Sequence, residues 1–353
     1  MKRFLYLLAN ELKLFRTSIP VHLVAVLQPA VLYLLMSSLL VHPTFDVFMA
    51  QPTTVEGQKL AAAMGEVGSP IGEPYIALHF VEGIDPSQSE RQVIRVEDRQ
   101  GRPTAVQRFG LVDSNMVKNF RNRLTASALR VWNANLGNQA VILEEHPWLP
   151  KDVSYLVYFG MAMLPIAAAL GPCILGGLLT AQEFETGTIL EARLAPVKME
   201  MILGARLVRL TLFGLLGAGV ALLGMGWLNH YWPESLGMVA LILLPVAVIY
   251  GCVGVIAGLH FRKAIPSFLI GLVVPMVGWL LGSAFGLSGG FSVGYEAISR
   301  LTPNTHAVEL LFPYYFGAAV RQPWISSLVL TLMSLAMILI TGLVYRARVF
   351  HQE

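Results

Sequence analysis

Residues 153–182 read VSYLVYFGMAMLPIAAALGPCILGGLLTAQ, a stretch of 30 residues without aspartate, glutamate, lysine or arginine. About 20 apolar residues in a helix are enough to cross the hydrocarbon core of a bilayer, which is about 30 Å thick. This stretch is therefore long enough to span a membrane. Further charge-free stretches, each at least 24 residues long, lie at 17–45, 210–233, 235–261, 264–295 and 322–345. The sequence predicts six transmembrane helices.

The composition excludes several other classes of protein. Of the 353 residues, 55% are hydrophobic and 13% are charged, and the mean hydropathy is +0.61. An ordinary soluble domain has about a quarter of its residues charged, so neither a soluble enzyme nor a disordered chain is expected. The net charge of +3 is too small to indicate a nucleic-acid partner. Cys173 and Cys252 lie in apolar runs and indicate neither a disulfide framework nor a metal site.

The lysine and arginine residues indicate the orientation of the chain. Twelve of them lie in the N-terminal segment, in the second-to-third and fourth-to-fifth connections and at the C-terminus. The short connections on the other side contain two, Arg300 and Arg321. By the positive-inside rule, we expect a multi-pass protein of the cell (inner) membrane with both termini in the cytoplasm. Residues 1–16 predict an amphipathic interfacial helix, and 17–41 the first span. The lack of a disulfide framework fits a bacterium.

Residues 42–152 are different in character, because they contain 24 of the 47 charged residues. Their pattern predicts a helix over 54–64 and a longer one from about Ser114 to Leu136. Strands are predicted over 74–81, 91–97, 103–109 and 139–143, and a turn at 98–101 joins two of them. The predicted fold is an all-α polytopic membrane protein with an inserted α+β extracytoplasmic domain between the first and second spans.

The sequence contains no recognisable catalytic motif. It has no Gly-Lys dipeptide, which excludes a Walker A loop in this chain, and no His-Glu-x-x-His or Cys-x-x-Cys motif. It therefore offers no catalytic residue and no metal site. Long runs without aspartate, glutamate, lysine or arginine also argue against an ion-coupled secondary transporter, because such proteins usually carry coupling groups inside the membrane. That class stays as an alternative, since backbone carbonyls can bind sodium.

The cytoplasmic connection between the second and third spans carries the most distinctive pattern. Gly187 ends the helix that continues from the second span, Thr188 can cap a short helix over 189–194, and Pro196 ends that helix. A short helix that projects from the membrane suits docking to a cytosolic partner. The order of residues is Glu183-x-Glu185-x-Gly187-Thr188-x-x-Glu191, followed by Ala195-Pro196.

This order resembles the coupling-helix signature of ABC-2-type permeases, the membrane subunits of ATP-binding-cassette exporters. The layout of the spans is similar as well, with residues 153–348 containing spans two to six and 290–320 resembling an external re-entrant segment. The resemblance implies two permeases, identical or paralogous, and two separate ATPase subunits that bind ATP and Mg. It implies no cofactor and no enzymatic activity in this chain.

The resemblance also implies roles for particular residues. The coupling segment, 183–200, contacts the ATPase through Glu183, Glu185, Gly187, Thr188, Glu191 and Pro196. The alternative is an ordinary loop whose glycine and proline make turns. Family analogy places spans one, two and five at the interface between the two permeases. Aromatic and methionine residues there are pathway candidates for an amphipathic or apolar substrate, with packing against lipid or the core as the alternative: Tyr33, Met36, Tyr158, Met161, Met163 and Trp279.

Two functional alternatives remain at this point. In the first, a mechanotransmission subunit, ATP hydrolysis moves the ectodomain 42–152 so that it acts on a periplasmic partner, and nothing crosses the membrane. In the second, an ion-coupled secondary transporter, no ATPase is needed, and an internal repeat is usual.

Overall fold

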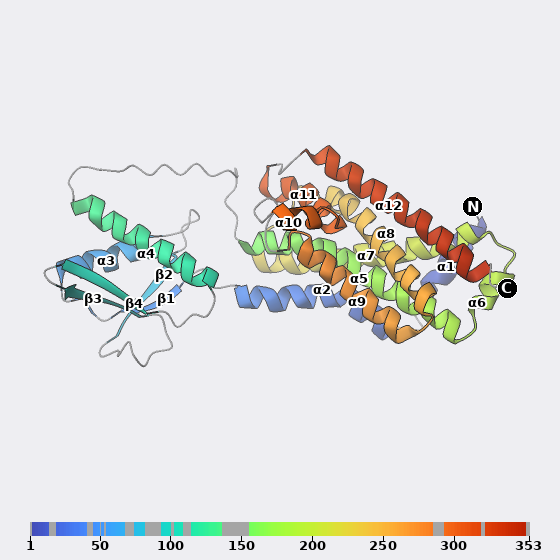
Figure 1. Cartoon of the computed structure of the whole chain (residues 1–353), viewed down its shortest axis with the longest axis horizontal. Helices are drawn as coiled ribbons and strands as arrows, with labels where there is room; N and C mark the ends of the chain where they lie inside the picture. The colour runs from blue at the N-terminus through green and yellow to red at the C-terminus, as the bar shows by residue number, and fades with distance from the viewer. Residues whose placement is uncertain are drawn as a thin grey trace. The chain divides into compact units, whose positions relative to one another are not determined.

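A computed structural model gives the fold (Figure 1) and describes residues 2–13, 19–40, 45–49, 51–52, 54–67, 74–81, 93–99, 102–108, 114–135, 155–284, 293–318 and 322–350. The chain divides into two compact units. The first consists of Met1–Leu39 together with Leu149–Glu353, and the second of Leu40–Trp148.

The first unit is built from helices. In chain order they are α1 (Lys2–Lys13), α2 (Ile19–Leu40), α5 (Tyr155–Glu185), α6 (Ile189–Leu194), α7 (Met199–Asn229), α8 (Leu236–Phe261), α9 (Ala264–Leu281), α10 (Val293–Ser299), α11 (Pro303–Phe316) and α12 (Pro323–Tyr345), followed by the π-helical segment η3 (Arg346–Phe350). Among the described residues, five helices are long and apolar enough to cross a membrane: α5, α7, α8, α9 and α12. The predicted first span corresponds to α2, whose apolar stretch Ile19–Leu35 is shorter. A polytopic helical membrane protein is thus confirmed, and the sixth span stays a prediction.

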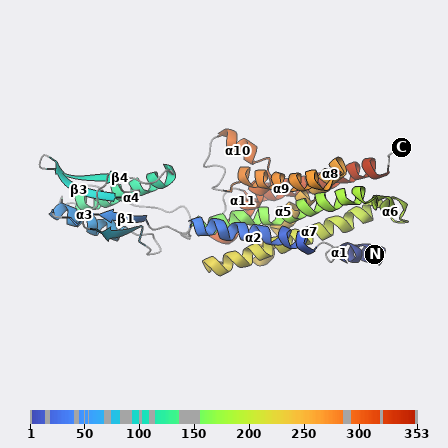
Figure 2. The same cartoon turned by 90° about the horizontal axis from the view of Figure 1, so that it is seen from below.

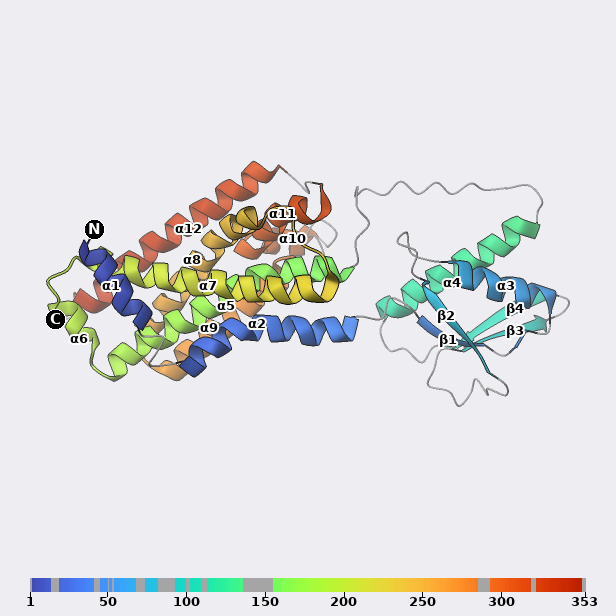
Figure 3. The same ribbon diagram turned by 180° about the vertical axis from the view of Figure 1, so that it is seen from behind.

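Helix α5 lies at the centre of this unit, packed against α7, α8 and α9 (Figure 3). Its side chains are almost all buried, whereas those of α12 are mostly exposed. Small residues make this central position possible. Gly176 and Gly177 bring α5 close to the backbones of α8 and α9, because an added Cβ would lie about 3 Å from backbone atoms there. Close helix contacts at glycine are the usual way in which membrane helices associate.

The two ends of the helical unit carry different elements. Helices α1 and α6 lie at one end, near the C-terminus of the chain (Figure 2). Helices α10 and α11 lie at the opposite end (Figure 1). Both belong to 290–320, the residues that resemble an external re-entrant segment in the sequence.

The second unit is a small α+β structure. Four strands, β1 (Phe45–Met49), β2 (Ile76–Phe80), β3 (Val93–Arg99) and β4 (Arg102–Arg108), form a sheet in the order β2-β1-β3-β4. β1 is parallel to β2 and β3, and β3 is antiparallel to β4. Helices α3 (Val55–Glu66) and α4 (Ser114–Asn135) pack on one face of the sheet, where they meet Val47 of β1, Ile76 of β2 and Ile94 of β3.

The sequence patterns located most of this unit, with two differences. Strand β1 was not expected, although its residues Val47 and Met49 are fully buried. The turn between β3 and β4 is shorter than expected, because Arg99 pairs with Arg102 and leaves only two residues between the strands instead of four. The predicted strand 139–143 lies outside the described residues.

Candidate functional site

The connection from α5 through α6 to α7 contains the residues that the sequence assigned to ATPase coupling. Helix α5 ends at Glu185, and the chain turns at Gly187, whose φ is +77°. This left-handed conformation strains any residue with a Cβ, which explains the glycine. The backbone N–H of Leu190 then donates to the carbonyl of Gly187 (3.1 Å), and α6 begins.

Thr188 occupies the N-cap position of α6, but it does not cap the helix as predicted. Its backbone is helical and its side chain accepts no hydrogen bond from a helix N–H. Its hydroxyl lies 3.0 Å from that of Thr186, which donates to the carbonyl of Gln182 (2.8 Å). The threonine pair therefore ties the turn to the last turn of α5.

Glu183 takes part in a buried charge cluster. It accepts a hydrogen bond from Nη2 of Arg206 in α7, while Nη1 of Arg206 donates to Oγ1 of Thr180 (3.2 Å). Arg209, one turn further along α7, forms an ion pair with Glu11 of α1 through Nη1 and Oε2 (2.6 Å). Nε of Arg206 lies 3.9 Å from Oε1 of the same glutamate. Two arginines and two glutamates thus join the ends of α1, α5 and α7 with no net charge.

Glu185 also has a structural partner. Its Oε1 accepts the backbone N–H of Ala264 (3.0 Å), the first residue of α9. A carboxylate at a helix N-terminus satisfies an otherwise free N–H group and interacts favourably with the helix dipole. The neighbouring Phe184 ring lies 5.1 Å from the guanidinium carbon of Arg262. These contacts attach the end of α5 to the short connection between α8 and α9.

Helix α6 buries an apolar residue on one side and exposes apolar residues on the other. Ile189 is buried in an apolar cluster with Leu207 of α7 and with Tyr345 and Val349 at the C-terminal end of the chain. Leu190 is more than half exposed, and Leu194, one turn further on, is 84% exposed. One side of α6 is anchored, and the other presents leucines to the surroundings.

The structure divides the six predicted coupling residues into two groups. Glu183 and Glu185 bind other parts of this chain, although Glu185 is itself exposed. The remaining four are exposed and have no bond to another helix among those described: Gly187, Thr188, Glu191 and Pro196. The sequence missed the partners Glu11, Arg206 and Arg209. The one available signal was the spacing of the two arginines, which places them on one face of a helix.

One comparison with known proteins identifies a family. The family model described as ABC-2 family transporter protein matches residues 86–343. The chain belongs to the ABC-2 transporter family. The comparison with curated proteins finds no match. As an ABC-2 permease, it is a multi-pass membrane component of an ABC transporter, and its family implies an ATPase partner subunit.

The pathway candidates of this ABC-2 permease lie in the interior of the helical unit. None of the described five is more than 9% exposed, and all belong to one apolar cluster: Tyr33, Tyr158, Met161, Met163 and Trp279. The Tyr158 hydroxyl donates to the carbonyl of Ser283 (2.8 Å), and Nε1 of Trp279 donates to that of Ala162 (2.9 Å). The side chain of Met36 lies outside the described residues. Their burial supports core packing, and the pathway role stays a prediction.

The described residues of the permease contain no cluster of three or more His, Cys, Asp or Glu side chains able to hold a metal ion. In the second unit, His79 pairs with Asp46 (Nε2 to Oδ1, 2.8 Å) and stacks on Phe48 (5.1 Å between ring centroids).

Proposed function

We propose that this chain is the permease subunit of an ATP-driven exporter that moves an amphipathic or apolar substrate outward across the membrane. Two ATPase subunits bind on the cytoplasmic side and hydrolyse ATP, and a second permease, identical or paralogous, completes the pathway. The chain itself is not an enzyme. We place it in the inner membrane of a bacterium, with α1, α6 and both termini in the cytoplasm.

The observation that carries this proposal is the pair of exposed leucines on an anchored α6. An apolar side chain that is 84% exposed, as Leu194 is, gains free energy when a partner covers it. Ile189 and the Glu183–Arg206 bond hold the other side of the segment in place. A helix fixed in this way transmits a movement of its partner to α5 and α7, because it cannot slide independently of them.

The first experiment is affinity purification of the tagged chain from its native membrane, followed by identification of the co-purifying subunits. We expect a stoichiometric cytosolic protein with a Walker A motif. The variant Leu194→Asp places a charge on the docking surface and should reduce the amount of that ATPase at least about tenfold, as the loss of an interface hot spot does.

The matched control is Leu301→Asp, because Leu301 is similarly exposed (76%) but lies beside α11, at the opposite end of the unit. This variant should retain the ATPase. If both variants retained the same amount of ATPase, α6 would not be the docking element. Recovery of the chain alone, also after crosslinking, would instead favour the ion-coupled transporter.

A second function is supported by the burial of the pathway candidates. In a mechanotransmission subunit, ATP hydrolysis moves the second unit against a periplasmic partner, and the helical core stays closed. Cysteine accessibility separates the two functions. With Cys173 and Cys252 replaced by alanine, Met161→Cys should react with a water-soluble thiol reagent during ATP turnover in an exporter. Lasting protection under turnover would favour mechanotransmission.

A further inference from the structure

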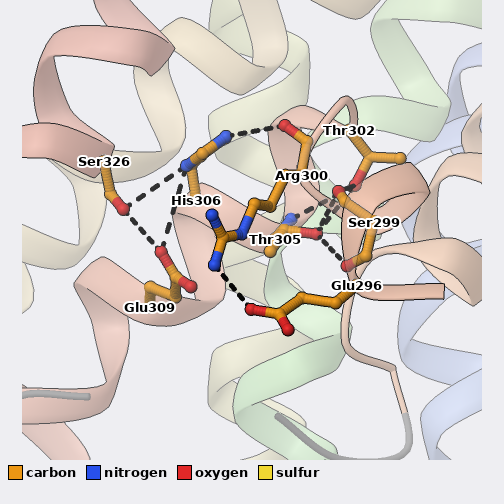
Figure 4. Close-up of polar contacts among 8 residues, drawn as sticks. All are labelled: Glu296, Ser299, Arg300, Thr302, Thr305, His306, Glu309 and Ser326. Carbon is orange, nitrogen blue, oxygen red and sulfur yellow. Dashed lines mark hydrogen bonds and ion pairs between the residues drawn. The ribbon is translucent and has the colours of Figure 1, made fainter. Parts of the chain in front are cut away.

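The external end of the helical unit contains a buried chain of polar side chains that the proposed function does not use (Figure 4). His306 and Glu309 lie one turn apart on α11 and face Ser326 in the first turns of α12. None of the three residues is more than 8% exposed. Burial of a carboxyl group and an imidazole together requires that their hydrogen bonds and charges be compensated locally.

The contact between His306 and Arg300 fixes which nitrogen of the imidazole ring donates a hydrogen bond. Nε2 of His306 lies 2.9 Å from the carbonyl oxygen of Arg300, which can only accept, so Nε2 carries a hydrogen. In a neutral imidazole the other nitrogen, Nδ1, is then an acceptor. Nδ1 lies 3.4 Å from Oγ of Ser326 and 4.0 Å from Oε2 of Glu309.

The number of protons in this group of side chains decides whether every buried acceptor has a hydrogen-bond donor. Ser326 has one hydroxyl hydrogen, and its Oγ lies 2.5 Å from Oε2 of Glu309. If the imidazole is neutral and the carboxylate is ionised, this single hydrogen faces two acceptors, and one buried acceptor remains without a donor. One additional proton removes the defect in either of two ways. It can reside on Nδ1, which then donates to Ser326, or on Glu309, which then donates to Ser326 while Ser326 donates to Nδ1.

The electrostatic free energy of the site also favours the additional proton. Without the additional proton the site holds one uncompensated buried negative charge, and with it the site is neutral overall. Burial lowers the pKa of His306 and the charge of Glu309 opposes this shift. The proton is therefore best assigned to the coupled pair and not to either residue alone.

The surrounding groups do not supply a competing charge. Arg300 of the α10–α11 connection pairs with Glu296 of α10 (2.5 Å), so these two charges compensate each other. From α8, the hydroxyl of Tyr250 lies with the amide of Asn304 beside Gly278 of α9. The nearby hydroxyl groups bond among themselves, with Oγ1 of Thr305 donating to the carbonyl of Ser299 (2.6 Å). In the part of the chain that the structure describes, the pair has no other ionic partner.

We propose that His306, Ser326 and Glu309 form a site that binds one proton, and that the bound proton joins α11 to α12. Burial by itself lowers the pKa of His306, which would weaken proton binding in the folded protein. The hydrogen-bond count and the buried charge act in the opposite direction, and on these geometric grounds we expect the folded site to hold the proton more tightly than the unfolded chain does. Its stabilising effect is therefore present at low pH and is lost as the pH rises through the titration of the pair. The site does not depend on the identity of the transported substrate.

Hydrogen–deuterium exchange of the full-length protein in detergent, from about pH 5 to about pH 9, tests this site around the range in which histidine titrates. In the wild type, amide exchange in α11 and the first turns of α12 should rise about tenfold as the proton is lost, after correction for the intrinsic pH dependence of exchange. The variant Glu309→Gln should abolish this rise, because the amide donates permanently to Ser326 as the protonated carboxyl group does.

Two further variants keep the test decisive. His306→Gln removes the titrating ring and retains hydrogen-bonding groups, so it should also abolish the pH-dependent rise, and it serves if Glu309→Gln does not fold. Ser326→Ala interrupts the chain and should give fast exchange at every pH. An equal pH-dependent rise in the wild type and in Glu309→Gln or His306→Gln would overturn the proposal, as would an unchanged rate in the wild type.

Discussion

Glu183 at the end of α5 accepts a hydrogen bond from Arg206 of α7, and this bond spans the connection that contains α6. The sequence between the two residues includes every exposed residue of the coupling segment. Because Arg206 is buried and also lies near Glu11, the base of α6 cannot move without disturbing three helices. The bond therefore fixes the two ends of the connection that contains α6 to the helical core.

The other ion pair of this cluster gives the first prediction. Glu11→Gln should destabilise the protein by about 3 kcal/mol, because Arg209 is almost fully buried and loses its carboxylate partner. Thermal unfolding in detergent and protease cleavage after α1 measure the effect. Glu200→Gln is the matched control, an exposed glutamate of α7, and should change stability by less than about 0.5 kcal/mol. Equal stability of the two variants would show that Glu11 does not hold α1.

Gly187 gives a prediction about the orientation of α6. Gly187→Ala should cost about 1–2 kcal/mol, because its φ of +77° forces Cβ toward the backbone. The cost is one of local backbone conformation, since no atom beyond the adjacent residues lies within 4 Å of the added Cβ. Gly187→Asn should cost less, because asparagine tolerates this region better. The amount of co-purified ATPase should be highest with glycine at position 187, lower with asparagine and lowest with alanine. An equal amount in all three proteins would show that the conformation of this turn does not affect ATPase binding.

Much of the helical unit could be predicted from the sequence, because the bilayer imposes a strong and local pattern. A run of about 20 residues without charge is rare in soluble proteins, so α5, α7, α8, α9 and α12 are visible without tertiary information. Strands β2, β3 and β4 and helices α3 and α4 follow from alternation and helical spacing in the same way. Strand β1 was missed because it directly follows the apolar first span, where no change of period marks its beginning.

The charge cluster could not be predicted, because its partners are distant in sequence. Glu11 and Arg209 are 198 positions apart, and no local pattern relates them. For the same reason Glu183 was assigned to an interface with the ATPase, although its side chain faces Arg206. Position in a motif indicates which segment is functional, but only tertiary packing shows which of its side chains are available to a partner.

The exposed pair of His79 and Asp46 gives a prediction of a small effect. Both side chains are about half exposed or more, so solvent screens the interaction, and His79→Gln should change the free energy of unfolding by less than about 1 kcal/mol. Met64→Ala, in the buried core of the same unit, should cost about 2–5 kcal/mol. Chemical unfolding, followed by a probe in the second unit, compares the two. A large loss in His79→Gln alone would indicate a role beyond the observed pair.

The contact between α5 and α8 gives a prediction about packing. A Cβ at Gly254 of α8 would lie 2.2 Å from the carbonyl oxygen of Cys173 in α5, so Gly254→Ala must push the two backbones apart. We expect a loss of about 1–3 kcal/mol or more, as for other overpacked sites, and a lower unfolding temperature in detergent.

Gly219→Ala is the matched control, because the added Cβ meets no atom within 4 Å. It should be neutral or stabilise by up to about 1 kcal/mol, since alanine favours the helix. If Gly254→Ala proved as stable as Gly219→Ala, α5 and α8 would have to lie further apart than in this structure, and the central position of α5 would be wrong.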